Sequence, residues 1–135
     1  MSNFASVEAE QAVLGSLLID SRCARSVAAI LRETDFSVAL NQELFRVICT
    51  MDRDGQPIDG LTVCAEALRQ SLAEEKTLRK YLAKLMETTP TAANVEMYAD
   101  IVARTARRRE LKTALEDGLA ALADQAPEDE VLTQL

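Results

Sequence analysis

The segment "ANVEMYADIVARTARRRELKTALEDGLAALAD", residues 93–124, contains no proline and a single glycine, Gly118, so it predicts one long helix. On a helical wheel at about 100° per residue its side chains form two stripes. The first stripe contains Tyr98, Ile101, Val102 and Thr105. The second contains Leu111, Leu115, Leu119 and Leu122, and it is rotated from the first by roughly 100°. Because a single core does not require this rotation, we expect the first half of the helix to pack on a globular body and the second half to leave it.

A basic cluster lies where the two stripes meet. Between residues 101 and 112 the cations are Arg104, Arg107, Arg108, Arg109 and Lys112, and Glu110 is the only acid. The local charge is therefore +4, whereas the whole chain carries −7. The wheel places Arg104 and Arg108 beside the leucines and Arg109 toward the face that continues the body contact.

The cluster has three alternative roles: salt bridges across a subunit or hairpin interface, a solvated face, or contact with DNA or another partner. Nucleic-acid modules usually combine basic residues with exposed stacking aromatics, but the only aromatic near the cluster, Tyr98, falls on the body face. We therefore predict an oligomer interface made of Leu111, Leu115, Leu119, Leu122, Arg104 and Arg108. The candidates for contact with nucleic acid or a partner are Arg107, Arg109 and Lys112.

The rest of the chain predicts an all-α fold, because helical spacing of apolar residues recurs and strand-type alternation does not. We expect helices over residues 7–18, 23–31, 40–51, 61–68 and 78–86, and a loop over residues 53–60. Residues 1–92 would form a small helical bundle. Residues 93–135 would form the long helix and the start of a helical hairpin in the same structural domain.

Several single residues have predicted structural roles. Asn41 is a candidate cap of the third helix, Asp59 or Thr62 of the fourth, and Asn94 or Thr91 of the long helix. Gly15 lies inside the first helix, where glycine is disfavoured by about 1 kcal/mol against alanine. We therefore predict a close helix crossing at Gly15.

The last residues, "DQAPEDEVLTQL" at 124–135, predict a turn at residues 125–127 and then a helix with an acidic first turn. This helix has barely begun when the sequence stops. We expect a hairpin that is cut short at residue 135.

The sequence contains none of the common catalytic or cofactor motifs. There is no histidine and no CxxC, which argues against a metal site, and Cys23, Cys49 and Cys64 are expected to be buried free thiols. GxxxxGK[ST], GxGxxG, HExxH and GxSxG are all absent. The carboxylates of Glu8, Glu10, Glu74 and Glu75 are assigned to solvated helix faces. We expect no catalytic residue, no cofactor and no metal in this chain.

Localisation is predicted from two further absences in the sequence. Residues 1–11 lack the basic and apolar regions of a signal peptide, and no stretch approaches the ~18 apolar residues of a membrane span. We expect a cytoplasmic protein without a membrane partner.

Three blocks of the sequence resemble DnaB-family replicative DNA helicases. "EAEQAVLGSLLID" at residues 8–20 is similar to the opening signature of that family. "DFSVALNQELFRVICTMDRDGQPIDGLTV" at residues 35–63 resembles its second block, and "TPTAANVEMYADIVA" at residues 89–103 its third. The resemblance extends from about residue 7 to residue 124, with the blocks in the family's order and at matching separations.

The resemblance implies an all-helical N-terminal domain of a ring-shaped hexameric helicase, a bundle followed by a helical hairpin. In that family the hairpins of neighbouring subunits pair, and the N-terminal domains form a collar. The collar docks the C-terminal domain of primase and in some lineages communicates with a helicase loader. ATP and Mg²⁺ bind in a separate motor domain, which is absent from this chain, and DNA passes through the ring.

The chain departs from the family pattern at three places. "EKTLRKYL" at residues 75–82 keeps Tyr81 and Leu82 but lacks the family's glycines, Asn41 and Gln42 stand where a histidine is frequent, and the proline before Glu8 is missing. Two other functions stay open at this stage. The chain could be a nucleic-acid-binding module acting through residues 104–112, or a free-standing adaptor that joins a helicase collar.

Overall fold

The computed structural model describes residues 2–135, with side chains from residue 7 onward. This part of the chain folds into seven α-helices and two short 3-10 helices and contains no strand. The helices are α1 (Ser2–Ile19), η1 (Ser21–Cys23), α2 (Ala24–Ile30), η2 (Glu33–Asp35), α3 (Ala39–Arg53), α4 (Gly60–Arg69), α5 (Glu75–Glu87), α6 (Val95–Ala123) and α7 (Glu128–Gln134). The predicted all-α class is confirmed.

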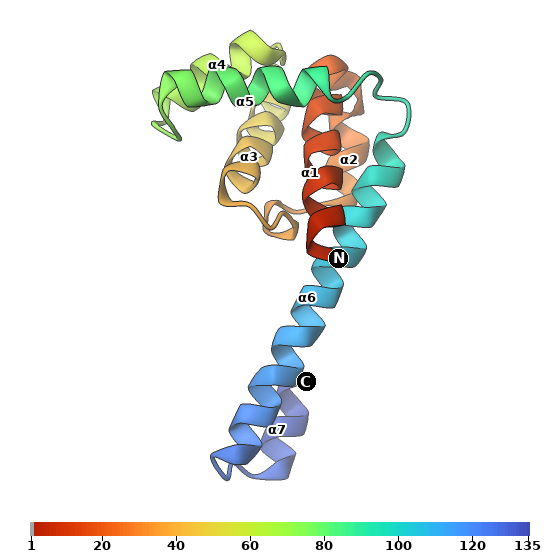
Figure 1. Ribbon diagram of the computed structural model, residues 1–135, viewed down its shortest axis with the longest axis vertical. Coiled ribbons are helices and arrows are strands. Elements are labelled where there is room, and N and C mark those ends of the chain that lie inside the picture. Colours follow the sequence, from red (N-terminus) through yellow and green to blue (C-terminus); the bar gives the residue numbers. More distant parts are fainter. Residues whose placement is uncertain (1) are drawn as a thin grey trace.

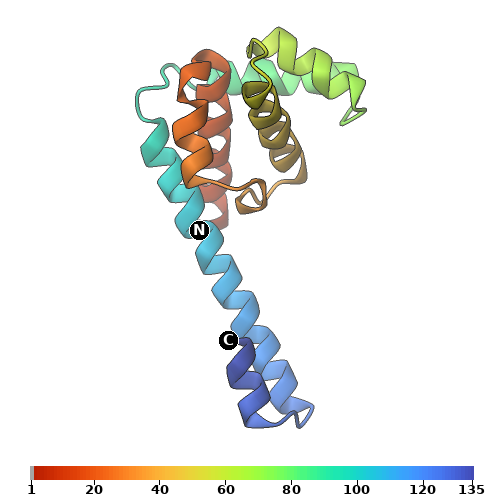
Figure 2. The same ribbon diagram turned by 180° about the vertical axis from the view of Figure 1, so that it is seen from behind.

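Helices α1 to α5 form a body at one end of the molecule, and α6 connects this body to a hairpin at the other end (Figure 1). The first half of α6 packs along α1 and α2. The second half extends away from the body, and α7 folds back along it (Figures 1 and 2). The long helix predicted over residues 93–124 is therefore one uninterrupted helix, and only its first half has a partner in the body.

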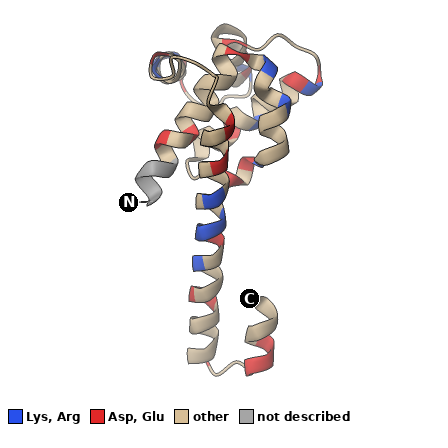
Figure 3. Ribbon diagram, turned by 90° about the vertical axis from the view of Figure 1, so that its right-hand side faces the viewer, with Lys and Arg blue, Asp and Glu red and all other residues tan. Residues whose placement is uncertain are grey.

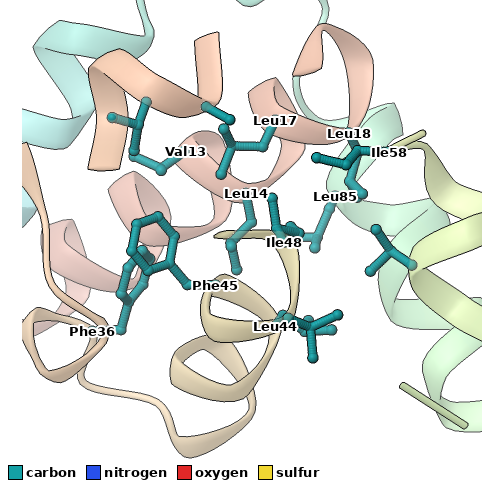
Figure 4. Close-up of a cluster of buried hydrophobic side chains, with 14 of the residues drawn as sticks. Val13, Leu14, Leu17, Leu18, Phe36, Leu44, Phe45, Ile48, Ile58 and Leu85 are labelled. Carbon is teal, nitrogen blue, oxygen red and sulfur yellow. The ribbon is translucent and has the colours of Figure 1, made fainter. Parts of the chain in front are cut away.

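The core of the body consists mainly of aliphatic side chains from α1, α3 and α5 (Figure 4). Leu14 and Leu17 of α1, Leu44 and Ile48 of α3 and Leu85 of α5 are at most 1% exposed. Phe36, in the connection before α3, packs on Phe45 with ring centroids 4.8 Å apart. Since such aliphatic side chains recur every three or four residues, each helix buries one face in this core.

Gly15 lies at a close crossing of α1 with the end of α5, as predicted. A Cβ atom at Gly15 would lie 2.5 Å from the backbone oxygen of Leu85 and 2.3 Å from Oγ1 of Thr89. Real Cβ atoms do not approach other atoms so closely. The absence of a side chain therefore permits the two helices to touch.

The loop after α3 ends where Asp59 caps α4, and this prediction is also confirmed. The Asp59 carboxylate accepts a hydrogen bond of 2.8 Å from the backbone N–H of Thr62, and the Thr62 hydroxyl accepts one of 2.9 Å from the N–H of Asp59. The two residues thus form a reciprocal capping box.

The Asp59 cap predicts a pH-dependent contribution to stability. The hydrogen bond from the Thr62 N–H holds the pKa of Asp59 below its ordinary value. The contribution is therefore complete above the ordinary pKa of about 3.9 and is lost as pH falls through the lower pKa of the folded state. Asp59→Asn keeps a capping oxygen that does not titrate. We expect the wild type to lose more stability than Asp59→Asn between about pH 6 and pH 2 in matched urea denaturations. Equal losses would contradict the assignment.

The predictions for Asn41 and Glu10 were wrong. Asn41 is not a helix cap: it lies inside α3, fully buried, and Val38 occupies the N-cap position. Glu10 is not on a solvated face, since it is 0% exposed. Its carboxylate accepts hydrogen bonds from the Ser37 N–H and hydroxyl at 2.9 and 2.6 Å and from the Asn41 amide at 3.0 Å. The hydroxyl of Tyr81 donates to the side-chain oxygen of Asn41, so this buried network joins α1, α3 and α5.

The start of α6 agrees only in part with its two predicted caps. Asn94 occupies the N-cap position but its side chain makes no capping hydrogen bond. The Thr91 hydroxyl instead accepts a hydrogen bond of 3.1 Å from the N–H of Ala93, in the turn before the helix.

No helix in residues 2–135 has the length and apolarity needed to cross a membrane. The sequence shows no signal peptide in residues 1–11. Of these, residue 1 lies outside the described residues.

Candidate protein-interaction surface

The four leucines predicted at an interface, called here the leucine stripe, lie on the outer part of α6 and are exposed. Leu111 is 62% exposed, Leu115 49%, Leu119 68% and Leu122 47%. Helix α7 does not cover them because it packs on a neighbouring face of α6. That face contains Gly118, where a Cβ atom would lie 3.5 Å from Cγ1 of Val131 in α7. Val131 is 4% exposed, so the hairpin buries its own small contact and leaves the leucine stripe open.

Three more apolar side chains, which the sequence reasoning missed, are also exposed. Met97 lies on the same side of α6 as the leucine stripe, nearer the body, and is 62% exposed. Leu132 and Leu135 of α7 are 67% and 58% exposed. The spacing of Met97 from Leu111, 14 residues or about four helical turns, could have placed it in the stripe from sequence. An exposed apolar patch such as the leucine stripe is a candidate interaction site.

The basic cluster divides into two groups that differ in what they contact. Figure 3 shows the basic segment at the point where α6 leaves the body. Arg107 donates a hydrogen bond of 3.1 Å to the Asp35 carboxylate, and Arg109 donates one of 2.8 Å to the Asp35 backbone oxygen. The side chain of Asp35 is fully buried. The hydrogen bond to Asp35 raises the pKa of Arg107, so this side chain remains a cation.

These contacts fix α6 to the connection between α2 and α3. The Asp35 carboxylate also accepts a hydrogen bond of 2.9 Å from the Arg32 N–H, and Glu110 contacts both Arg32 and Arg107, at 3.4 and 3.1 Å. Arg107 remains half-exposed, at 49% for its side chain. The wheel had placed Arg109 toward the body, and its hydrogen bond to Asp35 confirms that orientation.

Arg104 and Arg108 form the second group. Both are exposed, and among the described residues neither forms an ion pair within 4.0 Å or a side-chain hydrogen bond. Lys112 lies 3.8 Å from Glu116 on the same helix. The two unpaired arginines continue the leucine stripe toward the body, so a partner on this surface would meet leucines and then two cations.

The cysteines and carboxylates of the described residues do not form a reactive or metal-binding site. All three cysteines are free, Cys64 being buried and Cys23 and Cys49 half-buried. Burial raises the pKa of the Cys49 thiol to about 11, which keeps it protonated at neutral pH. No group of three potential ligands in residues 7–135 could hold a metal ion.

Comparison with known proteins identifies the family. The model of the DnaB-like helicase N terminal domain matches residues 2–104. The chain belongs to this family. The resemblance carried by the three sequence blocks is thereby confirmed, and the matched region is the N-terminal domain of these helicases rather than their motor.

Three replicative helicases illustrate the similarity. The chain is 37% identical over 131 residues to the replicative DNA helicase DnaB of Geobacillus stearothermophilus, covering 90% of this chain and 29% of that protein. It is 34% identical over 109 residues to the replicative DNA helicase DnaC of Bacillus subtilis (strain 168), which covers 80% of this chain and 24% of that protein. It is 39% identical over 106 residues to the replicative DNA helicase DnaB of Mycobacterium leprae (strain TN), which covers 78% of this chain and 18% of that protein. The chain thus spans less than a third of the length of each.

A solved structure extends the match into the hairpin. The N-terminal domain of DnaB helicase from Mycobacterium tuberculosis superposes with a TM-score of 0.84 at 34% identity. The match covers 95% of this chain and 91% of that chain. The DnaB family model stops at residue 104, whereas this structural match includes the hairpin as well as the body.

Proposed function

We propose that this DnaB-family domain is a collar module of a ring-shaped replicative helicase, which joins subunits through the leucine stripe and docks the C-terminal domain of primase. The observation that carries the proposal is the exposed leucine stripe, which neither the body nor α7 covers. The unpaired Arg104 and Arg108 beside it support a subunit contact, because the rest of the chain carries an excess of acids.

The complete helicase would divide its functions between domains. The sequence of this chain has no glycine-rich loop that could hold a phosphate, so its residues do not fit ATP and Mg²⁺. We place both in a separate motor domain, with DNA in the ring, a helicase loader as a further partner of the collar, and the whole assembly, a hexamer built from dimers, in the cytoplasm.

The test of self-association is the mass by light scattering after size exclusion, over a wide range of loading concentrations. We expect the wild type to form a dimer or a larger oligomer as concentration rises. Leu119→Glu would place a charge in the proposed interface, where an uncompensated buried charge is strongly unfavourable. We expect this variant to weaken self-association at least about tenfold, or about 1.4 kcal/mol.

Leu61→Glu is the matched control. Leu61 is an exposed leucine of α4, at 78% against 68% for Leu119, and it lies in the body rather than the hairpin. The same change of charge at Leu61 should leave the oligomer intact. A wild type that stays monomeric at all concentrations, or equal effects of the two variants, would overturn the role of the leucine stripe.

A second candidate function, binding of single-stranded DNA, is favoured by the unpaired Arg104 and Arg108. Several phosphate contacts would make such binding fall steeply between ~50 and ~200 mM salt. Loss of binding in Arg104→Glu/Arg108→Glu would support this function. The absence of any binding at the lower salt concentration would remove it.

A further inference from the structure

A groove between α2 and α3 lies on the body, away from the hairpin. Residues of α2, of α3 and of the connection between them line it, and Figure 2 shows how that connection joins the two helices. Its volume is about 640 Å³. The floor is apolar and includes Leu31, Phe45 and Cys49. Ala28 and its neighbour Ala29 are exposed, so the wall formed by α2 is low and a bulky side chain could reach the floor.

The rim of this groove is basic, although the chain is acidic. Four arginines line it, and the only acids among the lining residues are Glu33 and Asp52. The arginines are Arg25 and Arg32 on the α2 side and Arg46 and Arg53 on the α3 side. The lining residues thus carry a formal charge of +2, against −7 for the whole chain, before the ion pairs of Arg32 and Arg46 with acids outside the lining are counted.

Two of the four arginines are already neutralised within the chain and two are not. Arg46 lies 2.5 Å from Glu43, and Arg32 contacts Asp35 and Glu110. Arg25 and Arg53 form no ion pair within 4.0 Å among the described residues, and the only side-chain hydrogen bond of Arg53 is to the Thr50 hydroxyl, at 3.2 Å. One unpaired guanidinium therefore stands on each wall of an apolar trough.

We propose that the α2–α3 groove binds an acidic amphipathic helix of a partner protein. Aliphatic side chains at helical spacing would enter the trough between Ala28 and Cys49, and carboxylates beside them would pair with Arg25 and Arg53. Helix-in-groove recognition needs both features: an apolar face that is buried and charges that fix its orientation. The proposal is independent of the leucine stripe, which lies on another part of the chain.

The chemistry of the groove favours a protein helix over nucleic acid. Single-stranded nucleic acid binds through exposed aromatic stacking platforms, whereas the only aromatic of the groove, Phe45, is 3% exposed. Two unpaired cations are few for a phosphate backbone but match two carboxylates of one helix that flank its apolar stripe, one on each side.

The direct test is fluorescence anisotropy with a labelled peptide of about 18 residues that carries leucines at helical spacing flanked by glutamates. We expect the 135-residue chain to bind this peptide at about 50 mM salt, and to bind a version with lysines in place of the glutamates at least about tenfold more weakly. Arg25→Glu/Arg53→Glu should weaken binding of the acidic peptide by a similar factor. Lys76→Glu/Lys80→Glu, which changes the charge equally on exposed residues of α5, should leave it within about twofold.

Ala28→Trp gives a charge-neutral variant that fills the trough, and its far-UV circular dichroism checks that the fold is retained. It should also weaken peptide binding at least about tenfold, because the apolar side chains of the peptide lose their site. Peptide-induced amide shifts at Ala28 and Cys49 in NMR spectra would place the contact in the groove.

Four outcomes would overturn the proposal. The first is that the acidic peptide does not bind at concentrations up to about 1 mM, and the second is that it binds Arg25→Glu/Arg53→Glu as tightly as the wild type. The third is that oligothymidylate binds instead of the peptide, and that this binding depends on Arg25 and Arg53. The fourth is that Arg25→Glu/Arg53→Glu lowers the oligomeric mass. The third result would assign the groove to nucleic acid and the fourth to a second copy of this chain. None of them depends on whether Leu119→Glu disrupts self-association.

Discussion

Gly15→Ala is expected to destabilise the domain by about 1–3 kcal/mol, although alanine is the better helix former by about 1 kcal/mol. The added Cβ would lie 2.5 Å from the backbone oxygen of Leu85 and 2.8 Å from Cβ of Thr89. A flexible side chain could move aside, but the Leu85 carbonyl belongs to the last turn of α5. The substitution therefore forces α1 and α5 apart, and the tightly packed core between them cannot absorb the shift without losing contacts.

Gly118→Ala is the matched control, because it makes the same substitution in another helix without a clash. Its Cβ would lie 3.4 Å from Cδ2 of Leu135 and 3.5 Å from Cγ1 of Val131, which is ordinary contact. The gain in helix propensity should then dominate, and stability should rise by up to about 1 kcal/mol. Urea denaturation followed by circular dichroism measures both variants. Stabilisation by Gly15→Ala would mean that the crossing at Gly15 is looser than the structure indicates.

Much of the fold could be predicted from sequence because the helices have strong local signals. The apolar spacing locates α1, α3, α5 and α6, and the Asp59–Thr62 pair defines the start of α4 by a local hydrogen-bonded motif. The rotation between the two stripes of α6 predicted that the second half leaves the body, since the two halves cannot face one core.

Three helices are followed by a residue with positive φ, and one of these residues is glycine. Helix α3 ends at Arg53, and Gly55 two residues later has φ of 70°, so the sequence marks this turn clearly. Helices α4 and α6 are followed in the same way by Ser71 and Gln125, with φ of 57° and 63°. Serine and glutamine carry no strong preference for this conformation. The turn at residues 125–127 was nevertheless predicted, because Pro127 and the acidic residues after it mark the start of the next helix, whereas the turn at Ser71 has no such signal and is defined by the hydrogen bond from the Leu72 N–H to the Ala67 carbonyl.

The buried polar contacts of the candidate site and of the body differ in whether they could have been predicted from the sequence. Asp35 meets Arg107 across 72 residues, and no local pattern relates the two. Glu10 is different: it precedes Val13, Leu14 and Leu17 by three, four and seven residues, so a wheel places it on the buried face of α1. Asn41 has the same relation to Leu44, Phe45 and Ile48 in α3. Both residues were misassigned because their polarity was given more weight than their position.

Replacing Glu10 with alanine should cause one of the larger losses of stability among single substitutions in the domain, about 2–3 kcal/mol. The carboxylate accepts hydrogen bonds from the Ser37 N–H and hydroxyl and from the Asn41 amide, with the Val38 N–H at 3.4 Å. Alanine leaves these donors without an acceptor: the Asn41 amide is fully buried, whereas the Ser37 and Val38 donors belong to exposed residues that water can reach. Each buried donor that loses its partner costs about 1–3 kcal/mol, and neighbouring donors share part of that cost.

Two further variants help to interpret the effect of Glu10→Ala: Glu10→Gln separates the hydrogen bonds of Glu10 from the bulk of its side chain, and Glu8→Ala is a control at an exposed residue. Glu10→Gln keeps the size but replaces one acceptor oxygen with an NH2 group, and we expect a smaller loss of about 1–2 kcal/mol. Glu8→Ala, two residues earlier on the exposed face of α1, should change stability by less than about 0.5 kcal/mol. Urea denaturation measures all three variants, and equal effects of Glu10→Ala and Glu8→Ala would contradict a buried network.

The effect of Glu10→Ala should also reach α6, because residues 33–38 are held from two sides. Glu10 binds Ser37 from α1, and Arg107 and Arg109 bind Asp35 from α6. Once Ser37 is released, the connection that anchors α6 to the body has lost one of its two supports. Amide hydrogen exchange should therefore accelerate at Ser37 and Val38 and, to a smaller degree, at Arg107 and Arg109, while the Val131 amide in α7 should exchange at its original rate. Faster exchange that stopped at Val38 would show that Asp35 alone is sufficient to hold the start of the hairpin arm.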